Sequence, residues 1–209
     1  MITIGLTGGI GTGKSSVAGI LQELGAAIVD ADKLGHEAYV PNTDGWRAVV
    51  EAFGRDILTP NNEIDRRKLG GIVFSDPAHL AKLNSIMHPR IKAMAVERFK
   101  QLAAQGTKVA VLEAAVLVEA KWTDIVDELW VTTADEDVCV RRVRARNNLP
   151  EGAVRARIRS QIPAAERLKY AQAAVANNGD LNELRRTVEQ VWNKRILSRI
   201  GGHVHSQSH

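Results

Sequence analysis

The sequence predicts an α/β fold with a parallel β-sheet, and three features of its patterning support that prediction. First, residues 1–32 predict in order a short apolar strand, a glycine-rich loop, a helix and a second apolar strand. The two strands of such a unit run parallel, because the connecting helix crosses over one face of the sheet. Second, the later apolar runs are nearly continuous, which is typical of strands covered on both faces. Third, the segments between them show helical spacing.

The strands are expected where β-prone or apolar residues run up to a turn signal. The first spans Ile2–Thr7 and ends at a Gly-Gly pair. Apolar residues at positions 17, 20, 21 and 24 then predict a helix, which Gly25 ends. The other strands are expected at Ala26–Asp30, Lys108–Glu113, Glu128–Thr133 and Ala173–Ala176.

The remaining segments are predicted to be mostly helical. About 75 residues separate the second strand from the third, too many for a plain crossover, and they indicate a helical subdomain over one edge of the sheet. Its helices are expected at Gly45–Phe53, Arg66–Phe74 and Pro77–Ala104. Later helices are expected at Glu136–Arg146, Glu151–Gln161, Ala164–Ala174 and Leu181–Ser198.

Length and composition indicate one globular domain with an anionic partner. The chain has 209 residues, 44% of them hydrophobic, and a net charge of +4. Residues 141–169 hold nine basic and two acidic residues, so this window alone carries +7. Such a local excess suits nucleotides, phosphorylated metabolites, nucleic acid or an anionic membrane.

The chain offers no sign of export or membrane insertion. Its one cysteine, Cys139, cannot form an intrachain disulfide, which favours a reducing compartment and a structural role on a helix. Residues 1–4 lack the basic start of a signal peptide, and no apolar run reaches the roughly 18 residues of a membrane span. We therefore expect a cytoplasmic protein.

Residues 8–15, Gly-Gly-Ile-Gly-Thr-Gly-Lys-Ser, match the phosphate-loop pattern G-x-x-x-x-G-K-[ST] in full. Glycines let successive N–H groups point at phosphate oxygens, and the following helix N-terminus favours negative charge. Lys14 would reach the β- and γ-phosphates, and Ser15 would offer its hydroxyl to Mg²⁺. The candidate nucleotide-binding residues are Gly9, Gly11, Thr12, Gly13, Lys14, Ser15 and Ser16.

The loop predicts nucleotide binding without choosing an activity. A regulatory GTPase would need a base-reading N-K-x-D motif. The chain's Asn193-Lys194 pair is followed by Arg195-Ile196, so that motif is missing.

Two aspartates follow the second predicted strand. Asp30 and Asp32 come at its carboxyl end, where open parallel sheets bind their ligands. A carboxylate there can accept a proton from an attacking hydroxyl or help to hold Mg²⁺. The alternative is a turn aspartate that caps a helix starting near Lys33. Function is favoured for Asp32, while for Asp30 the two readings are evenly balanced.

The arginines after position 140 are candidates for binding transferring phosphate. Arg142 and Arg146 are four residues apart and so share a helix face. Arginines on a closing lid would stabilise the charge that develops during phosphoryl transfer. Arg146 is the first candidate and Arg142 the second. For any single arginine, a solvated surface position is the alternative.

Together these residues make the chain resemble the dephospho-CoA kinase family over nearly its whole length, to about Ile200. The phosphate loop alone is generic, whereas its combination with three other features is specific: Asp-Ala-Asp at 30–32, His88-Pro89, and Asn177-Asn178-Gly179. Arg146 and Gln161 follow in the expected order. Residues 34–39 and 114–122 are similar to the kinase half of the animal bifunctional CoA synthase.

The resemblance implies a three-layer P-loop kinase fold with helical CoA-binding and lid subdomains. It implies a core at about 1–32, 106–135 and 172–200, an acceptor-binding part at about 33–105 and a lid at about 141–170. The sequence of residues 201–209 itself predicts a flexible tail. The tail's His203, His205 and His209 are expected to be solvated.

The resemblance also implies the reaction: ATP would phosphorylate the ribose 3′-hydroxyl of dephospho-CoA, with Mg²⁺ and with Asp32 as the catalytic aspartate. His88, Pro89 and Gln161 would bind substrate, and Asn177 would lie near the adenine of ATP. Glu113 stands where many relatives have aspartate, and it would face Mg²⁺. The expected partner is dephospho-CoA alone, without nucleic acid or membrane, and the protein would be a monomer or weak homo-oligomer.

Two other functions share the phosphate loop. One is a P-loop kinase for a nucleoside or a small hydroxylated acid, which would differ in the acceptor pocket. The other is a nucleic-acid-binding P-loop ATPase that uses the basic window at 141–169. Grooves for single strands usually interleave aromatic residues, and this window has none before Tyr170, which argues against the second.

Overall fold

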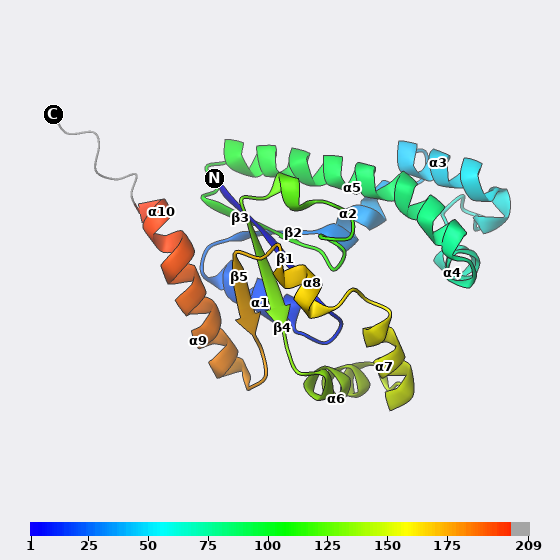
Figure 1. Cartoon of the computed structure of the whole chain (residues 1–209). Helices are drawn as coiled ribbons and strands as arrows, with labels where there is room; N and C mark the ends of the chain where they lie inside the picture. Colours follow the sequence, from blue (N-terminus) through cyan, green and yellow to red (C-terminus); the bar gives the residue numbers. More distant parts are fainter. Residues whose placement is uncertain (202–209) are drawn as a thin grey trace. The chain divides into compact units, whose positions relative to one another are not determined.

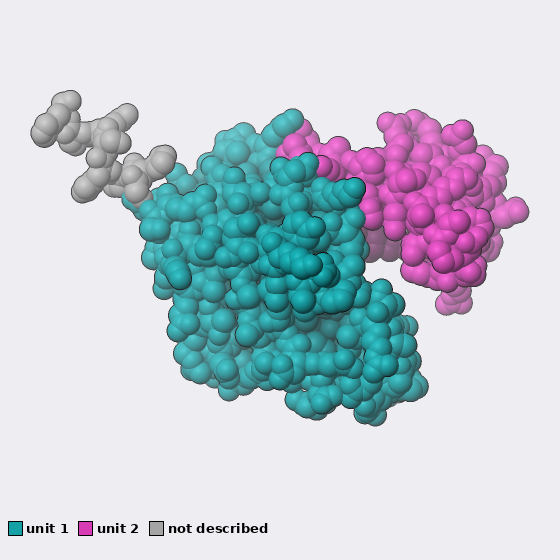
Figure 2. All heavy atoms as spheres, viewed as in Figure 1, with its two compact units in different colours: residues 1–29, 99–209 teal, residues 30–98 magenta. Residues whose placement is uncertain are grey.

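The computed structural model describes residues 1–201 and divides them into two compact units. Residues 1–29 and those from 99 onward form the first unit, and residues 30–98 form the second (Figure 2). Each unit is described by itself. The expected tail, with its three histidines, lies outside the described residues except for Gly201, which still belongs to a helix.

The first unit contains a five-stranded parallel sheet of order β2-β3-β1-β4-β5 (Figure 1). The predicted strands are confirmed with ends shifted by at most one residue. Their bounds are β1 Ile2–Gly8, β2 Ala27–Asp30, β3 Val109–Glu113, β4 Glu128–Thr133 and β5 Ala173–Ala176. In the central strand, Leu6 is in register with Glu113 of β3 and Gly8 with Thr132 of β4. The carboxyl ends of β1, β3 and β4 therefore meet at one edge.

Helices α1 (Lys14–Glu23) and α9 (Leu181–Trp192) pack against each other, and α9 also contacts β5 (Figure 1). The core beneath them is mostly aliphatic, as expected from the low aromatic content, but it includes the buried rings of Trp130 and Trp192. Gly25 ends the first helical segment with a φ of 98°, which a glycine adopts without strain.

Three helices follow β4: α6 (Glu136–Asn147), α7 (Glu151–Arg159) and α8 (Ala164–Leu168). The prediction of one helix over Ala164–Ala174 was wrong in its extent. Alanine-rich sequence continues past Leu168, but the chain turns so that Gln172 N–H bonds to Leu129 O and β5 pairs with β4. Sheet pairing thus overrides helix propensity. The last predicted helix is interrupted by a π-helical turn, Asn193–Leu197, before α10 (Ser198–Gly201).

The second unit is helical, as predicted, and its helices begin at good caps. They are α2 (Ala31–Ala38), α3 (Asp44–Phe53), α4 (Arg66–Ser75) and most of α5 (Pro77–Ala104), which ends in the first unit. Thr43 and Asp65 accept backbone N–H groups at the starts of α3 and α4. Their core includes Val49, Ile57 and Val73.

A buried carboxylate anchors the C-terminal helices to the sheet. The side chain of Glu128, at the start of β4, is 6% exposed. It accepts hydrogen bonds from Arg195 (2.7 Å), Arg199 (2.8 Å) and the Trp130 indole (2.9 Å). The π-helical turn brings the two arginines, four residues apart, to one carboxylate. Because this carboxylate is buried, its partners are needed to offset its desolvation.

We expect Glu128→Gln to lower the free energy of unfolding by about 1–3 kcal/mol. The amide keeps the volume but loses the charge that both arginines face, and the solvent exposure of the arginines limits the loss. Chemical denaturation would measure the change. The control is Glu51→Gln on the exposed surface of α3, which should stay within about 0.5 kcal/mol of the parent. Equal stability of the two variants would contradict the anchoring role.

Candidate functional site

The phosphate loop joins β1 to α1, and its glycines are sterically required. Gly11 and Gly13 have φ of 79° and 89°, in the left-handed region. A β-carbon on Gly11 would lie 2.8 Å from the carbonyl oxygen of Cys139, and one on Gly13 would collide with the side-chain amide of Asn177. The loop is therefore packed tightly against α6 and the turn after β5. Cys139 is buried there, which raises the pKa of its thiol.

Hydroxyl groups tie the loop to the neighbouring strand. The Thr12 hydroxyl donates to Gly9 O at 2.8 Å and lies 2.7 Å from the hydroxyl of Thr132 on β4. The Thr132 hydroxyl is 3.2 Å from Thr7 O on β1. Both threonines are buried, so these hydrogen bonds are shielded from competing water. They fix the middle of the loop.

A cavity of about 480 Å³ opens beside the loop. Among the predicted site residues, its lining includes Gly11, Gly13, Lys14, Ser15, Ser16, Glu113, Arg142, Arg146 and Gln161. The structure thus brings these nine predicted residues to one place. Three cationic side chains against one carboxylate suit a polyanion such as a nucleotide polyphosphate.

Lys14 begins α1, and its ammonium group is folded back onto the loop. It donates to Gly8 O at 2.8 Å and to Gly9 O at 3.4 Å. This places a positive charge at the loop's edge on the wall of the cavity.

Arg142 and Asn177 form a clamp between α6 and the turn after β5. The Arg142 guanidinium donates to Asn177 O (2.7 Å), Asn177 Oδ1 (3.1 Å) and Gly179 O (3.1 Å). The Asn177 amide nitrogen in turn donates to Thr12 O at 2.9 Å. Asn177 is 6% exposed, and both ends of its amide have partners inside the protein. Its side chain therefore holds the loop, a role that sequence reasoning missed because 165 residues separate it from Thr12.

Gly9, Thr12 and Asn177 do not line the main cavity. Gly9 and Thr12 line a smaller one of about 140 Å³ together with Gln161 and Arg167. Asn177 lines another of about 180 Å³, which it shares with Gly13, Ser16 and Arg142. Arg142 and Ser16 thus border both the main cavity and the cavity beside Asn177.

The predicted sharing of a face by Arg142 and Arg146 is confirmed, since both line the main cavity. Arg146 is exposed on the last turn of α6, where its Nε donates to Asn147 Oδ1 at 3.0 Å. Its guanidinium is less constrained by the protein than that of Arg142.

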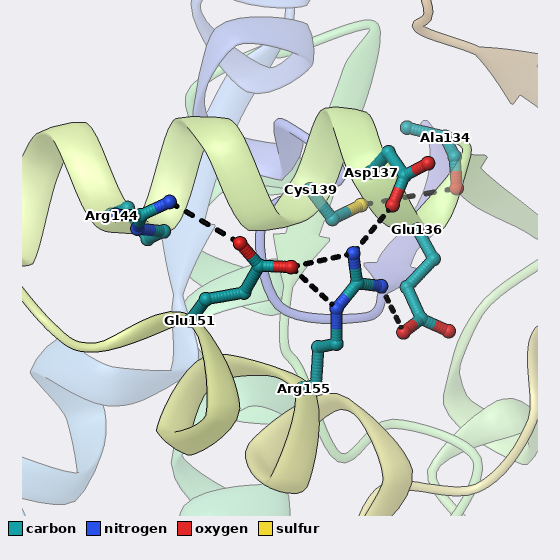
Figure 3. A network of polar contacts seen from close by, with 7 residues as sticks. All are labelled: Ala134, Glu136, Asp137, Cys139, Arg144, Glu151 and Arg155. Atoms are coloured by element: carbon teal, nitrogen blue, oxygen red, sulfur yellow. Dashed lines mark hydrogen bonds and ion pairs between the residues drawn. The ribbon is translucent and has the colours of Figure 1, made fainter.

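Other arginines of α6 and α7 are engaged by carboxylates (Figure 3). Arg155 on α7 pairs with Glu136 and Asp137 of α6 at 2.7 Å each and with Glu151 at 2.9 Å. Hydrogen bonding to Arg155 lowers the pKa of the Asp137 carboxyl, and the three carboxylates raise the pKa of Arg155. Arg144 also pairs with Glu151, at 3.3 Å. These arginines fasten α7 to α6 and do not line the main cavity.

Asp32, His88 and Pro89 belong to the second unit and are described with it. Asp30 proves to be the helix cap, since its Oδ1 accepts the N–H groups of Asp32 (2.9 Å) and Lys33 (3.2 Å). Asp32 is exposed in the first turn of α2. His88 is half-buried in α5 next to Pro89, and its burial lowers its pKa. The functional roles of these three residues stay predictions.

Residues 1–201 contain neither a cluster of metal ligands nor a helix that could span a membrane. No cluster of three or more His, Cys, Asp or Glu side chains there could hold a metal ion by itself. Within the same residues, no helix is both long enough and apolar enough to cross a membrane.

Comparison with known proteins gives a consistent result. The family model described as dephospho-CoA kinase matches residues 2–183. The dephospho-CoA kinase of Geobacter sulfurreducens is 45% identical over 196 residues, which cover 94% of this chain and 100% of the relative. The solved structure of dephospho-CoA kinase from Campylobacter jejuni aligns with a TM-score of 0.70 at 25% identity, over 96% of this chain and 98% of that one.

A shikimate kinase from Bacteroides thetaiotaomicron aligns with a TM-score of 0.57 at 12% identity, over 92% of this chain and 97% of that one, and so shares the fold. The predicted P-loop kinase fold is thereby confirmed.

We expect Asn177→Ala to weaken ADP binding by about tenfold, because the loop loses the hydrogen bond to Thr12 O and Arg142 loses one of its three oxygen partners, Asn177 Oδ1. Titration calorimetry would measure the dissociation constant. The matched control is Asn178→Ala, since the neighbouring amide accepts a hydrogen bond from Asp135 N and does not contact the loop. An Asn177→Ala variant with unchanged ADP affinity would show that the clamp is dispensable.

We expect Arg155→Met to speed backbone hydrogen exchange in residues 148–160 without a large change in melting temperature, since it frees α7 from the two carboxylates of α6, Glu136 and Asp137. The pKa of the Asp137 carboxyl is lower in the folded protein than its ordinary value near 3.8. Its contribution to stability is therefore complete above that ordinary pKa and is lost only as the pH falls through the lowered pKa. Protection attributable to this network should therefore be flat from about pH 5 to 8 and weaken in about 1 M salt. The control is Arg157→Met, which changes an exposed residue of the same helix. If Arg155→Met and Arg157→Met exchange at the same rate, the network does not hold α7.

Proposed function

The chain belongs to the dephospho-CoA kinase family, and we propose that it transfers the γ-phosphate of ATP to the ribose 3′-hydroxyl of dephospho-CoA, giving coenzyme A and ADP. The observation that carries the proposal is the single cavity that joins a complete phosphate loop to Glu113, Arg142 and Arg146. A kinase needs these elements: a cradle for the polyphosphate and cations for the charge that moves during transfer.

The nucleotide would bind with its phosphates along residues 11–16. Backbone N–H groups of the loop and the N-terminus of α1 favour the negative charge. Lys14 would exchange its hydrogen bonds to Gly8 O and Gly9 O for phosphate oxygens. The base would lie in the cavity beside Asn177 and Arg142. The side-chain amide of Asn177 is already hydrogen-bonded to Thr12 O, so the backbone of Asn177 would border the nucleotide.

Arg142 and Arg146, the two lid arginines that line the cavity, would act differently on the phosphate that is transferred. Arg142 is held in place by three hydrogen bonds to oxygen atoms of residues 177 and 179. It would act as a fixed charge near the phosphates. Arg146 is exposed and less restrained, so it can follow the γ-phosphoryl group as charge develops on its equatorial oxygens.

Asp32 would accept the proton of the attacking hydroxyl. It follows directly after the end of β2, where the Asp30 cap fixes its backbone while its own carboxylate stays exposed. A ribose hydroxyl attacks poorly unless a base takes its proton as the new bond forms. His88, Pro89 and Gln161 are proposed to contact the acceptor.

The donor set fits Mg²⁺. The Ser15 hydroxyl and the Glu113 carboxylate border one cavity, and Mg²⁺ usually takes only one or two protein ligands and completes its shell with phosphates and water. The longer reach of glutamate is compatible with this, because bound water can fill the remaining positions. The ion would neutralise charge between the β- and γ-phosphates. A cytoplasmic location, the monomeric or weakly associated state and the exclusion of nucleic acid stay predictions.

A coupled kinase assay tests the proposal. Purified protein would be given MgATP with dephospho-CoA, and in parallel with shikimate or nucleosides, because the shikimate kinases share the fold. We expect ADP release with dephospho-CoA alone, and mass spectrometry should find one added phosphate on the ribose. Turnover of a different acceptor, with none of dephospho-CoA, would replace this function by that of another small-molecule kinase.

We expect Asp32→Asn to lower kcat by about 10²–10⁴, because the amide keeps the size but cannot take the proton. ATP affinity measured by calorimetry should stay within a few-fold. The decisive control is a Mg²⁺ titration of the variant's kcat. Recovery of the rate at high Mg²⁺ would reassign Asp32 to the metal site, and near-parental turnover would refute any catalytic role.

A further inference from the structure

Arg167 is a buried charge that none of the roles above uses. It lies on α8, and its side chain is 2% exposed. Its Nη2 pairs with Glu119 Oε1 at 2.7 Å and its Nη1 donates to Ile162 O at 3.1 Å, while its Nε has no partner among the described residues. Burying a guanidinium with one donor unsatisfied is costly, so a hydrophobic residue would serve packing better.

The guanidinium lies close to the outer turn of the phosphate loop. A β-carbon on Gly9 would be 3.7 Å from Arg167 Nη1 and 3.3 Å from Gln161 Oε1. Arg167 also borders the small cavity that Gly9 and Thr12 line. The charge is therefore next to the start of the loop, away from the lining of the main cavity.

Gln161 connects the buried charge to the loop. Its Oε1 accepts the Ile10 N–H at 2.8 Å, and its neighbour Ile162 supplies the carbonyl that Arg167 grips. Gln161 also lines both the main and the small cavity. Arg167 thus holds residues 161–162 from one side, and these residues hold the loop from the other.

Through its ion pair with Arg167, Glu119 links a third segment of the chain to this contact network. It lies in the turn after β3, six residues beyond Glu113, which borders the main cavity. The pair therefore joins the segment after β3, the segment between α7 and α8, and the phosphate loop. Removing the cation would loosen all three contacts in one step.

We propose that Arg167 is a positioning residue: through Glu119 and Gln161 it fixes the Gly9–Ile10 turn in the conformation that binds the nucleotide phosphates. A loop that samples other conformations binds ligand more weakly, in proportion to the lost population of the competent one. The rival explanation is an ion pair that only stabilises the fold. The two differ in which constant changes.

The test compares Arg167→Met with Arg167→Lys. We expect Arg167→Met to raise both the KM for ATP and the calorimetric Kd for ADP by about tenfold. Arg167→Lys keeps the charge and should recover part of the affinity. The control is Lys169→Met, just past α8, whose exposed pair with Glu166 should not affect binding. Loss of melting temperature and active fraction with an unchanged ADP Kd would overturn the proposal.

A double-mutant comparison tests the route through Gln161 and does not need the Met variant to fold. If Arg167 acts through Gln161, Arg167→Lys should weaken ADP binding in the parent but have no further effect in a Gln161→Ala background. Equal weakening in both backgrounds would refute the coupling.

The proposed function enters this test only through the KM for ATP, which is measured with dephospho-CoA as the acceptor. ADP binding can be measured whichever acceptor the enzyme uses. If the parent protein does not phosphorylate dephospho-CoA, the proposed function is wrong, but the ADP-binding test of Arg167 remains valid.

Discussion

The packing of the phosphate loop against its buried supports is the constraint on which the rest of the structure depends. A loop that presents backbone N–H groups to a ligand cannot use those groups to stabilise itself, so its carbonyls, side chains and remaining N–H groups must be held by other elements. Thr132 on β4 and Asn177 after β5 supply that support at Thr12. Gly11 and Gly13 then become obligatory, because Cys139 lies so close to Gly11 and Asn177 so close to Gly13 that no β-carbon fits.

This constraint explains why the sheet order matters. With β1 between β3 and β4, the loop emerges where the carboxyl ends of both neighbours are within reach. Strand β3 then contributes Glu113 to the cavity, and β4 contributes Thr132 to the support. The short strand β5 is needed to carry Asn177 to the loop, so its pairing with β4 is a functional requirement as well as a structural one.

Local chemistry made the strands, the phosphate loop and most helices predictable from sequence, because each depends on residues close together in the chain. What could not be predicted depends on pairing at long range. Helix α8 ends where it does because β5 joins the sheet. The role of the Asn177 amide depends on Thr12, which is 165 residues away in the chain. Whether Asp30 or Asp32 caps α2 depends on the residue at which that helix starts. Nothing in the sequence of the basic window at 141–169 distinguishes the arginines that pair with carboxylates from those that line the cavity.

That separation follows from where the carboxylates lie. The helix positions of Glu136, Asp137 and Glu151 place three negative charges around Arg155, which removes it from the set available to a ligand. Arg142 instead donates to the carbonyl and amide oxygens of residues 177 and 179, which orient a guanidinium without neutralising it. An arginine that must act on an incoming phosphate needs oriented but uncharged partners, since a paired carboxylate would cancel the field that the phosphate is meant to feel. The charge of the basic window is thus divided between arginines that fasten α7 to α6 and arginines that line the cavity.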